Sequence, residues 1–181
     1  MKNLLTLIAA AGFAAPVLSQ PAPEPPKPCI QLRASFGFIV HASYAVTAPL
    51  FGPNGERAWA GEDWDPKFIY PQPANDVEGA VFTVSHGTHN TVWVNTLFDQ
   101  EARHFQYVYF LPEIMVATVD VRFKSIDAGT TQVNVVYTRT ALTPDANEHV
   151  AKMSEDDRKK GKEWQQAIDT YLARAKSGQR R

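Results

Sequence analysis

Two histidines lie close together in the run His86-Gly-Thr-His89, and they are the first residues of the sequence that suggest chemistry. Imidazole nitrogens and carboxylates bind metals, and Asp99 and His104 follow further along the chain. Histidines three apart on a turn do not share a helix face, however, and no third ligand follows at a diagnostic spacing. We therefore expect no metal site, and His86 remains only as a candidate general base at a strand end.

The sequence lacks the motifs that bind common cofactors or activate a serine. It contains no Gly-x-Ser-x-Gly elbow, no phosphate-binding glycine loop and no dinucleotide-binding fingerprint. Its single cysteine, Cys29, follows a proline-rich segment, and we expect it to be buried at the start of the first strand. We expect no cofactor, and no catalytic residue beyond His86 or a tyrosine of an apolar pocket.

Aromatic residues at alternate positions point to such a pocket, because alternate residues of a strand face the same side of a sheet. Tyr107 and Tyr109 share one face of a predicted strand, and Tyr137 faces inward on another. Tyrosines that face one cavity would give an apolar wall with hydroxyl groups that orient a small molecule, although the same residues would also serve as plain core. The candidate ligand-binding residues are Trp59, Trp64, Tyr70, Trp93, Tyr107, Tyr109, Val119, Val121, Phe123, Tyr137, Gly161 and Trp164.

Two features of this set leave alternatives open. Trp59 and Trp64 would lie at the mouth of the pocket, where they suit either stacking on a flat ligand or anchoring a polar loop. Gly161 falls on the inner stripe of the C-terminal helix, where a glycine costs about 1 kcal/mol relative to alanine. Its missing side chain would leave room for a ligand or let the helix approach the sheet. If it leaves room for a ligand, Gly161→Leu should weaken ligand uptake more than folding.

The order of segments along the chain predicts a targeting segment, a linker and one domain. Residues 1–19 have the charged start, apolar stretch and small residues of a secretory signal peptide, which is either cleaved before Gln20 or retained as an anchor. Residues 20–28 form a proline-rich linker that favours extended polyproline II. The domain covers residues 29–177, and residues 178–181 form a basic tail. We therefore expect a periplasmic or secreted protein.

The domain is predicted to consist mainly of strands closed by a helix. Residues 117–124 alternate strictly between apolar and polar, which is typical of a sheet with one buried face. Two short helices are expected over residues 43–51 and 56–61, separated by a breaker at Pro53-Asn-Gly55. Thr143 and Pro144 should begin a C-terminal helix, with a break near Met153. The expected strands are residues 30–41, 67–70, 79–86, 91–98, 105–111, 115–124 and 131–142.

The charges nearly cancel but are distributed unevenly. The 18 basic and 19 acidic residues give a formal net charge of −1, which argues against general nucleic-acid binding. From Lys152 onward there are nine basic and five acidic residues, whereas residues 20–151 contain eight and fourteen. The basic face of the C-terminal helix is either a solvated surface or a contact with a membrane surface. The sequence does not define an oligomeric state.

A set of short motifs in a fixed order covers about residues 30–175. The motifs are Glu56-x-x-Trp59, Trp64-x-Pro66, Tyr70, Glu78-Gly79-x-Val81-Phe82, Trp93, Asp99, Tyr107, Tyr137-Thr-x-Thr140-Ala-Leu and Trp164. In this order they resemble a bacterial branch of the START-like (SRPBCC) superfamily, which includes polyketide cyclases, lipid-transfer domains and birch-pollen-allergen-like proteins. No reaction is established for this branch, and an export signal departs from its usual cytoplasmic members.

The resemblance implies an α+β helix-grip fold. A curved antiparallel sheet of six to seven strands would wrap around a long C-terminal helix, with two short helices after the first strand and an apolar pocket between sheet and helix. The first functional hypothesis is an exported protein that binds an apolar or amphipathic small molecule, such as a lipid or an aromatic metabolite. The alternatives are a cyclase- or hydrolase-type enzyme that uses a pocket tyrosine or His86 for proton transfer, and a structural protein whose cavity is filled.

Overall fold

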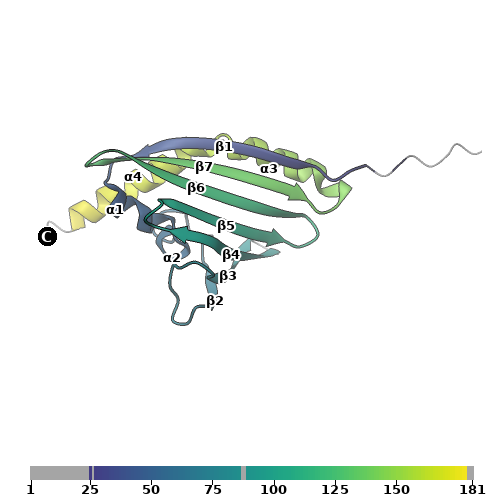
Figure 1. Ribbon diagram of the computed structural model, residues 1–181, viewed down its shortest axis with the longest axis horizontal. Coiled ribbons are helices and arrows are strands. Elements are labelled where there is room, and N and C mark those ends of the chain that lie inside the picture. The colour runs from purple at the N-terminus through teal and green to yellow at the C-terminus, as the bar shows by residue number, and fades with distance from the viewer. Residues whose placement is uncertain (1–24, 26, 87–88, 179–181) are drawn as a thin grey trace, which may run out of the picture.

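A seven-stranded antiparallel sheet forms the centre of the protein in a computed structural model that describes residue 25, residues 27–86 and residues 89–178. The strand order is β1-β7-β6-β5-β4-β3-β2, so the first and last strands pair and the others follow in sequence (Figure 1). This α+β helix-grip architecture confirms the predicted fold class. The strands are β1 (Gln31–Val40), β2 (Lys67–Tyr70), β3 (Val81–His86), β4 (His89–Asp99), β5 (His104–Leu111), β6 (Met115–Asp127) and β7 (Thr130–Ala141).

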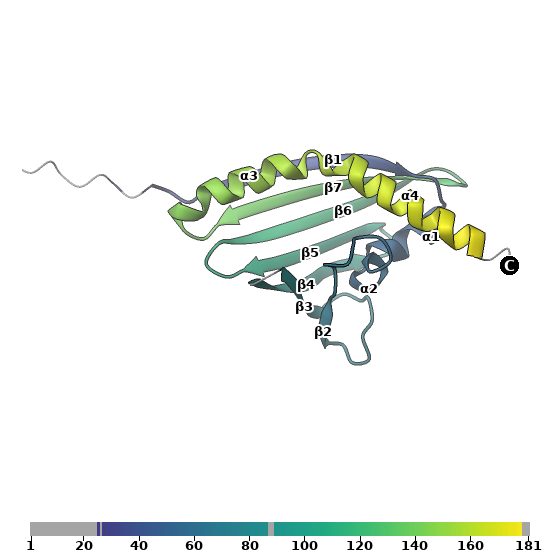
Figure 2. The ribbon, with the colours of Figure 1, turned by 180° about the vertical axis from the view of Figure 1, so that it is seen from behind.

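Helices follow the first and the last strand. The short helices α1 (Tyr44–Thr47), η1 (Ala48–Phe51) and α2 (Pro53–Glu56) lie between β1 and β2. The first two cover the predicted segment 43–51, whereas α2 precedes the predicted segment 56–61, which forms a turn after Glu56. After β7 come η2 (Pro144–Ala146), α3 (Asn147–Asp157) and α4 (Lys160–Gly178). Helix α3 packs on β1 and β7, and α4 packs on β1. Figure 2 shows the two long helices running one after the other along this side of the sheet.

Alternation along the strands brings the pocket candidates together. In β7 each second residue from Thr131 to Ala141 is buried, and β5 shows the same pattern. The strand register aligns Tyr107 of β5 with Val119 of β6, and Val119 with Tyr137 of β7. A row of inward-facing side chains therefore crosses the sheet. Because inward residues of antiparallel neighbours are adjacent, each row presents a continuous surface to the helices.

The C-terminal helix begins as predicted and breaks one turn later than predicted. The Thr143 side chain accepts a hydrogen bond from the Ala146 amide at 3.3 Å, and Pro144 is the first residue of η2. The break was expected near Met153 but lies between Asp157 and Lys160. Asp157 is fully buried at the end of α3 and is held by the sheet, as described below. The position of the break thus coincides with a buried ionic contact that helix periodicity does not reveal.

Two local predictions are wrong. Pro53 does not break a helix but is the first residue of α2, where its missing amide costs no hydrogen bond. The Asp76 carboxylate accepts from the next two amides, of Asn54 at 3.0 Å and Gly55 at 3.3 Å, and so caps this turn. Cys29 is exposed rather than buried, because β1 begins two residues later.

The predicted signal peptide at residues 1–19 lies outside the described residues, as do most of the linker and residues 179–181 of the tail. Among the helices that the structure describes, none combines the length and the apolar character needed to cross a membrane. Export therefore remains a prediction from the sequence.

Candidate functional site

A cavity of about 500 Å³ lies between the inner face of the sheet and the helices. Its floor consists of inward-facing residues of β3 to β7, and its other walls come from the α2 region and from helices α3 and α4. Exposed or partly exposed residues of α3, α4 and the segment after α2 form its rim. The rim residues are Ala60, Trp64, His149, Met153, Lys160 and Glu163.

Nine of the twelve predicted ligand-binding residues line this cavity. They are Trp59, Trp64, Trp93, Tyr107, Tyr109, Val119, Val121, Tyr137 and Trp164. Tyr70 does not, because it lies on the edge strand β2 with 60% of its surface exposed. Phe123 is buried against Phe51 and Phe105, at ring-centroid distances of 5.1 and 5.0 Å, in the core beside the cavity.

Gly161, the third exception, lies where α4 approaches β1. A Cβ atom at this position would stand 3.1 Å from the Gly37 carbonyl oxygen and 3.6 Å from the Phe36 ring. The glycine therefore allows close contact between helix and strand and does not line the cavity. Of the two roles that the sequence suggested, the structure supports packing, so the expected loss of ligand uptake in Gly161→Leu is replaced by a loss of stability.

The tryptophans form an apolar aromatic wall. Trp93 stacks on Tyr109 at a centroid distance of 4.2 Å, and Trp59 meets Trp164 edge-on at 5.2 Å. The indole nitrogen of Trp59 donates to the Leu50 carbonyl at 2.6 Å, and the indole nitrogens of Trp64 and Trp93 also donate within the protein. Trp59 and Trp64 thus combine the two predicted roles: their N–H groups anchor the loop, and their rings face the cavity.

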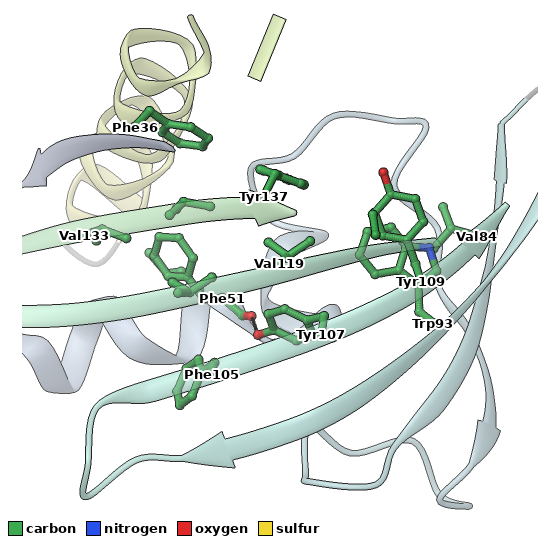
Figure 3. Close-up of a cluster of buried hydrophobic side chains, with 14 of the residues drawn as sticks. Phe36, Phe51, Val84, Trp93, Phe105, Tyr107, Tyr109, Val119, Val133 and Tyr137 are labelled. Atoms are coloured by element: carbon green, nitrogen blue, oxygen red, sulfur yellow. Dashed lines mark hydrogen bonds between the residues drawn. The ribbon is translucent and has the colours of Figure 1, made fainter. Parts of the chain in front are cut away.

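The three cavity tyrosines differ in what their hydroxyl groups bind. The Tyr107 hydroxyl donates to the Phe51 carbonyl (Figure 3), and the Tyr109 hydroxyl accepts from Arg139. Within the described part of the chain, the Tyr137 hydroxyl has no hydrogen-bond partner. Burial raises the pKa of Tyr107 and Tyr137 well above the usual phenol value. Tyr137 therefore presents a neutral hydroxyl group that is free to bind a ligand.

An ion pair that the sequence analysis missed closes one end of the cavity. Arg139 of β7 is only 1% exposed, and it donates through Nε to Asp157 at 2.6 Å and through Nη2 at 2.8 Å. Burial alone would lower the pKa of Arg139, but the hydrogen bonds and charge of Asp157 outweigh it and raise this pKa. Lys160 Nζ lies 3.8 Å from the same carboxylate. The alternation of residues along β7 already placed Arg139 on the inner face of the sheet. This position was the signal in the sequence that Arg139 is buried and needs a partner.

Glu56, the last residue of α2, is a second polar residue of the cavity that was missed as a site residue. It is half-buried, and no hydrogen bond or ion pair engages its carboxyl group within the residues that the structure describes. Loss of solvent, and then the charge of Asp76, raises the pKa of this carboxyl well above its usual value. No cation of the described residues offsets these effects, so this acidic group of the cavity lacks a counter-ion there.

The histidines do not form a centre in the described residues. His86 ends β3 and His89 begins β4, but the structure does not describe their side chains. The His104 ring nitrogen Nε2 lies 2.6 Å from Asp120 Oδ2 on the outer face of the sheet, away from the cavity. Among the side chains that the structure describes, which exclude those of His86 and His89, no three histidine, cysteine or acidic residues lie close enough together to hold a metal ion.

Solved structures match the fold, whereas no protein-family model and no curated protein sequence matches the chain. XoxI from Bacillus cereus is 15% identical at a TM-score of 0.58, over 75% of this chain and 94% of its own. A point mutant of norcoclaurine synthase from Thalictrum flavum, in complex with a transition-state analogue, is 11% identical. Its TM-score is 0.59, and the match covers 83% of this chain and 99% of the synthase chain. The same enzyme in complex with dopamine and hydroxybenzaldehyde is 10% identical. Its TM-score is 0.55, and the match covers 69% of this chain and 78% of the synthase chain. These likenesses show that the chain shares the helix-grip fold of these proteins.

Proposed function

We propose that this protein binds a small apolar or amphipathic molecule in the cavity between the sheet and the C-terminal helices. The observation that carries the proposal is the cavity itself, about 500 Å³ of space with an aromatic wall and a few polar groups. This size and composition are typical of sites for small organic molecules. A structural protein with a filled cavity is not supported, since the protein's own side chains leave this space open.

A cavity-filling variant tests the proposal. Val119 is 3% exposed and lies between Tyr107 and Tyr137 in the row across the sheet. Val119→Phe places a ring in the space that a ligand would occupy, whereas Thr118→Phe places the same ring on the opposite face of β6. We expect wild type and Thr118→Phe to bind the neutral dye Nile red with a blue shift in emission, and Val119→Phe to lose most of this binding. Equal binding by all three would contradict the proposal.

An enzyme with acid–base chemistry is the second candidate, and the free Tyr137 hydroxyl supports it. Since the pKa of Tyr137 is raised, this group would donate a proton or a hydrogen bond rather than act as a base. Tyr137→Phe would then abolish turnover of a substrate while its binding persisted. Retained turnover in Tyr137→Phe would exclude this role.

Export and membrane contact belong to the same proposal and have their own tests. Residues 1–19 would direct export, so N-terminal sequencing of the exported protein should begin at Gln20, and a full-length intracellular chain would contradict this. The exposed basic residues Lys162, Arg174 and Lys176 of α4 would contact anionic lipid. Co-sedimentation with phosphatidylglycerol vesicles, but not with phosphatidylcholine vesicles, is the expected result.

A further inference from the structure

The unpaired carboxyl group of Glu56 indicates what kind of ligand the cavity takes. Glu56 lies at the end of α2, and its carbonyl accepts from the amides of Trp59 at 3.1 Å and Ala60 at 2.8 Å, which fixes the backbone beside the cavity. Its side chain lines the cavity, as the residues of the aromatic wall do. A charged group removed from water is costly unless a partner of opposite charge or hydrogen-bond donors compensate it. No described residue provides such a partner for the half-buried Glu56, so it would come from water, a proton or a bound ligand.

The cation next to Glu56 in sequence and the arginine and lysine that line the cavity have other partners; Lys160 lies 3.8 Å from Asp157. The neighbouring Arg57 turns away and donates to Asp65 at 2.5 Å and to the Pro66 carbonyl. At the far end of the cavity, Arg139 is held by Asp157 and Tyr109. The charge of Asp76 adds repulsion. Among the described residues, Glu56 is thus a carboxyl group without a partner in a cavity with an aromatic wall.

The aromatic wall suits the same kind of ligand. Rings carry a negative face that attracts cations, and the attraction grows when the site is shielded from water. Trp59 is three residues from Glu56 and contacts Trp164, and the Tyr107 ring lies close enough for the charge of Glu56 to affect its pKa. One carboxylate with several ring faces is the combination that binds an organic ammonium group.

We propose that the cavity selects a ligand with a protonated amine on an apolar, ring-containing body, and that Glu56 is its counter-ion. This inference rests on the proposed binding function and adds the charge of the ligand to it. The amine would donate to the Glu56 carboxylate while the apolar body contacts the row formed by Tyr107, Val119 and Tyr137. An acidic ligand fits less well, because Asp157 already compensates the cations at the other end.

Three ligands that share one ring system test the inference. Naphthalene with an aminomethyl, a hydroxymethyl or a carboxylate group is titrated into the full chain at about pH 8, with binding followed by calorimetry. A charge-assisted hydrogen bond to a carboxylate supports a preference on the order of tenfold for the ammonium over the alcohol. In Glu56→Gln this preference should disappear while the alcohol binds as before. The exposed Glu155→Gln, on the outer side of α3, should retain it.

The outcomes separate this inference from the function on which it rests. Binding of the alcohol with no advantage for the ammonium would overturn the amine preference and leave the cavity function intact. Persistence of the preference in Glu56→Gln would overturn the role of Glu56. Tighter binding of the carboxylate would assign the ligand head group to the Lys160 end instead. Failure of all three compounds to bind wild type would overturn both proposals.

Discussion

The buried ion pair of Arg139 and Asp157 offers a quantitative test of how the cavity is built. Both residues are 1% exposed, and the carboxylate accepts two hydrogen bonds from the guanidinium. Asp157→Ala would leave Arg139 buried with Tyr109 and the Met115 sulfur as hydrogen-bond partners and the Tyr137 ring 4.6 Å away. Removal of one member of a buried pair costs about 3–5 kcal/mol. Since a domain has a stability of about 5–15 kcal/mol, this is a large share of the total.

The expected loss is measurable by two methods. For a chain of this size, each kcal/mol lowers the melting temperature by about 2–4 °C, so Asp157→Ala should melt about 6–20 °C below wild type. Urea unfolding gives the free energy directly. Arg139→Met should be similarly destabilised, because it leaves the buried Asp157 carboxylate without its arginine partner.

A double variant tests whether loss of the ion pair is the reason why the single variants are less stable. Replacement of both charges by apolar groups is often neutral or even stabilising, so Arg139→Met with Asp157→Leu should recover most of the loss. The sum of the two single effects should exceed the double effect by several kcal/mol. Single losses below about 1 kcal/mol, or strict additivity, would refute the view that this pair fixes the end of α3 on β7.

Three further predictions concern residues around the cavity. Because the pKa of Glu56 is raised in the folded state, the unfolded chain loses this proton first, and the protein loses stability as the pH rises above about 4.3 toward the folded-state pKa. In urea unfolding, Glu56→Gln should therefore be more stable than wild type, by a difference in free energy that grows over this pH interval. A difference that stays constant with pH would contradict this. Gly161→Leu should lose about 1–3 kcal/mol by crowding Gly37 and Phe36 while the folded protein binds Nile red normally, so a selective loss of dye binding would restore the ligand-space role. Tyr107→Phe should cost about 0.5–1.5 kcal/mol in thermal unfolding because the Phe51 carbonyl loses its donor, and an unchanged melting temperature would show that this bond contributes nothing.

Much of the sheet was predictable because alternation is a local signal. The register that aligns Tyr107, Val119 and Tyr137 follows from hairpins whose inward positions were legible in the sequence. The strand residues of the cavity were predictable for the same reason, and nine of the twelve candidate residues, seven of them aromatic, line the cavity. Gly161 was correctly placed on the inner stripe of α4, but periodicity could not say that this part of the stripe meets β1 rather than open space.

The polar part of the site depends on distant partners, which a local pattern does not contain. Arg139 occupies an inward position of β7, and an inward arginine demands a buried acid, but the sequence does not say that this acid is Asp157. Glu56 was quoted in a motif without a role, since its isolation arises from where Arg57 and Asp76 point in three dimensions. Cys29 and Pro53 were misjudged because strand and helix limits shift by a few residues under tertiary contacts.

Native mass spectrometry of the protein purified from the cells that naturally make it tests the central claim most directly. The claim is that the cavity of about 500 Å³ holds a small organic molecule. The account predicts a bound mass of one small molecule per chain on wild type, retained in Thr118→Phe and lost in Val119→Phe. A chain that is always empty, and that also fails to bind Nile red or the naphthalene compounds, would contradict the account.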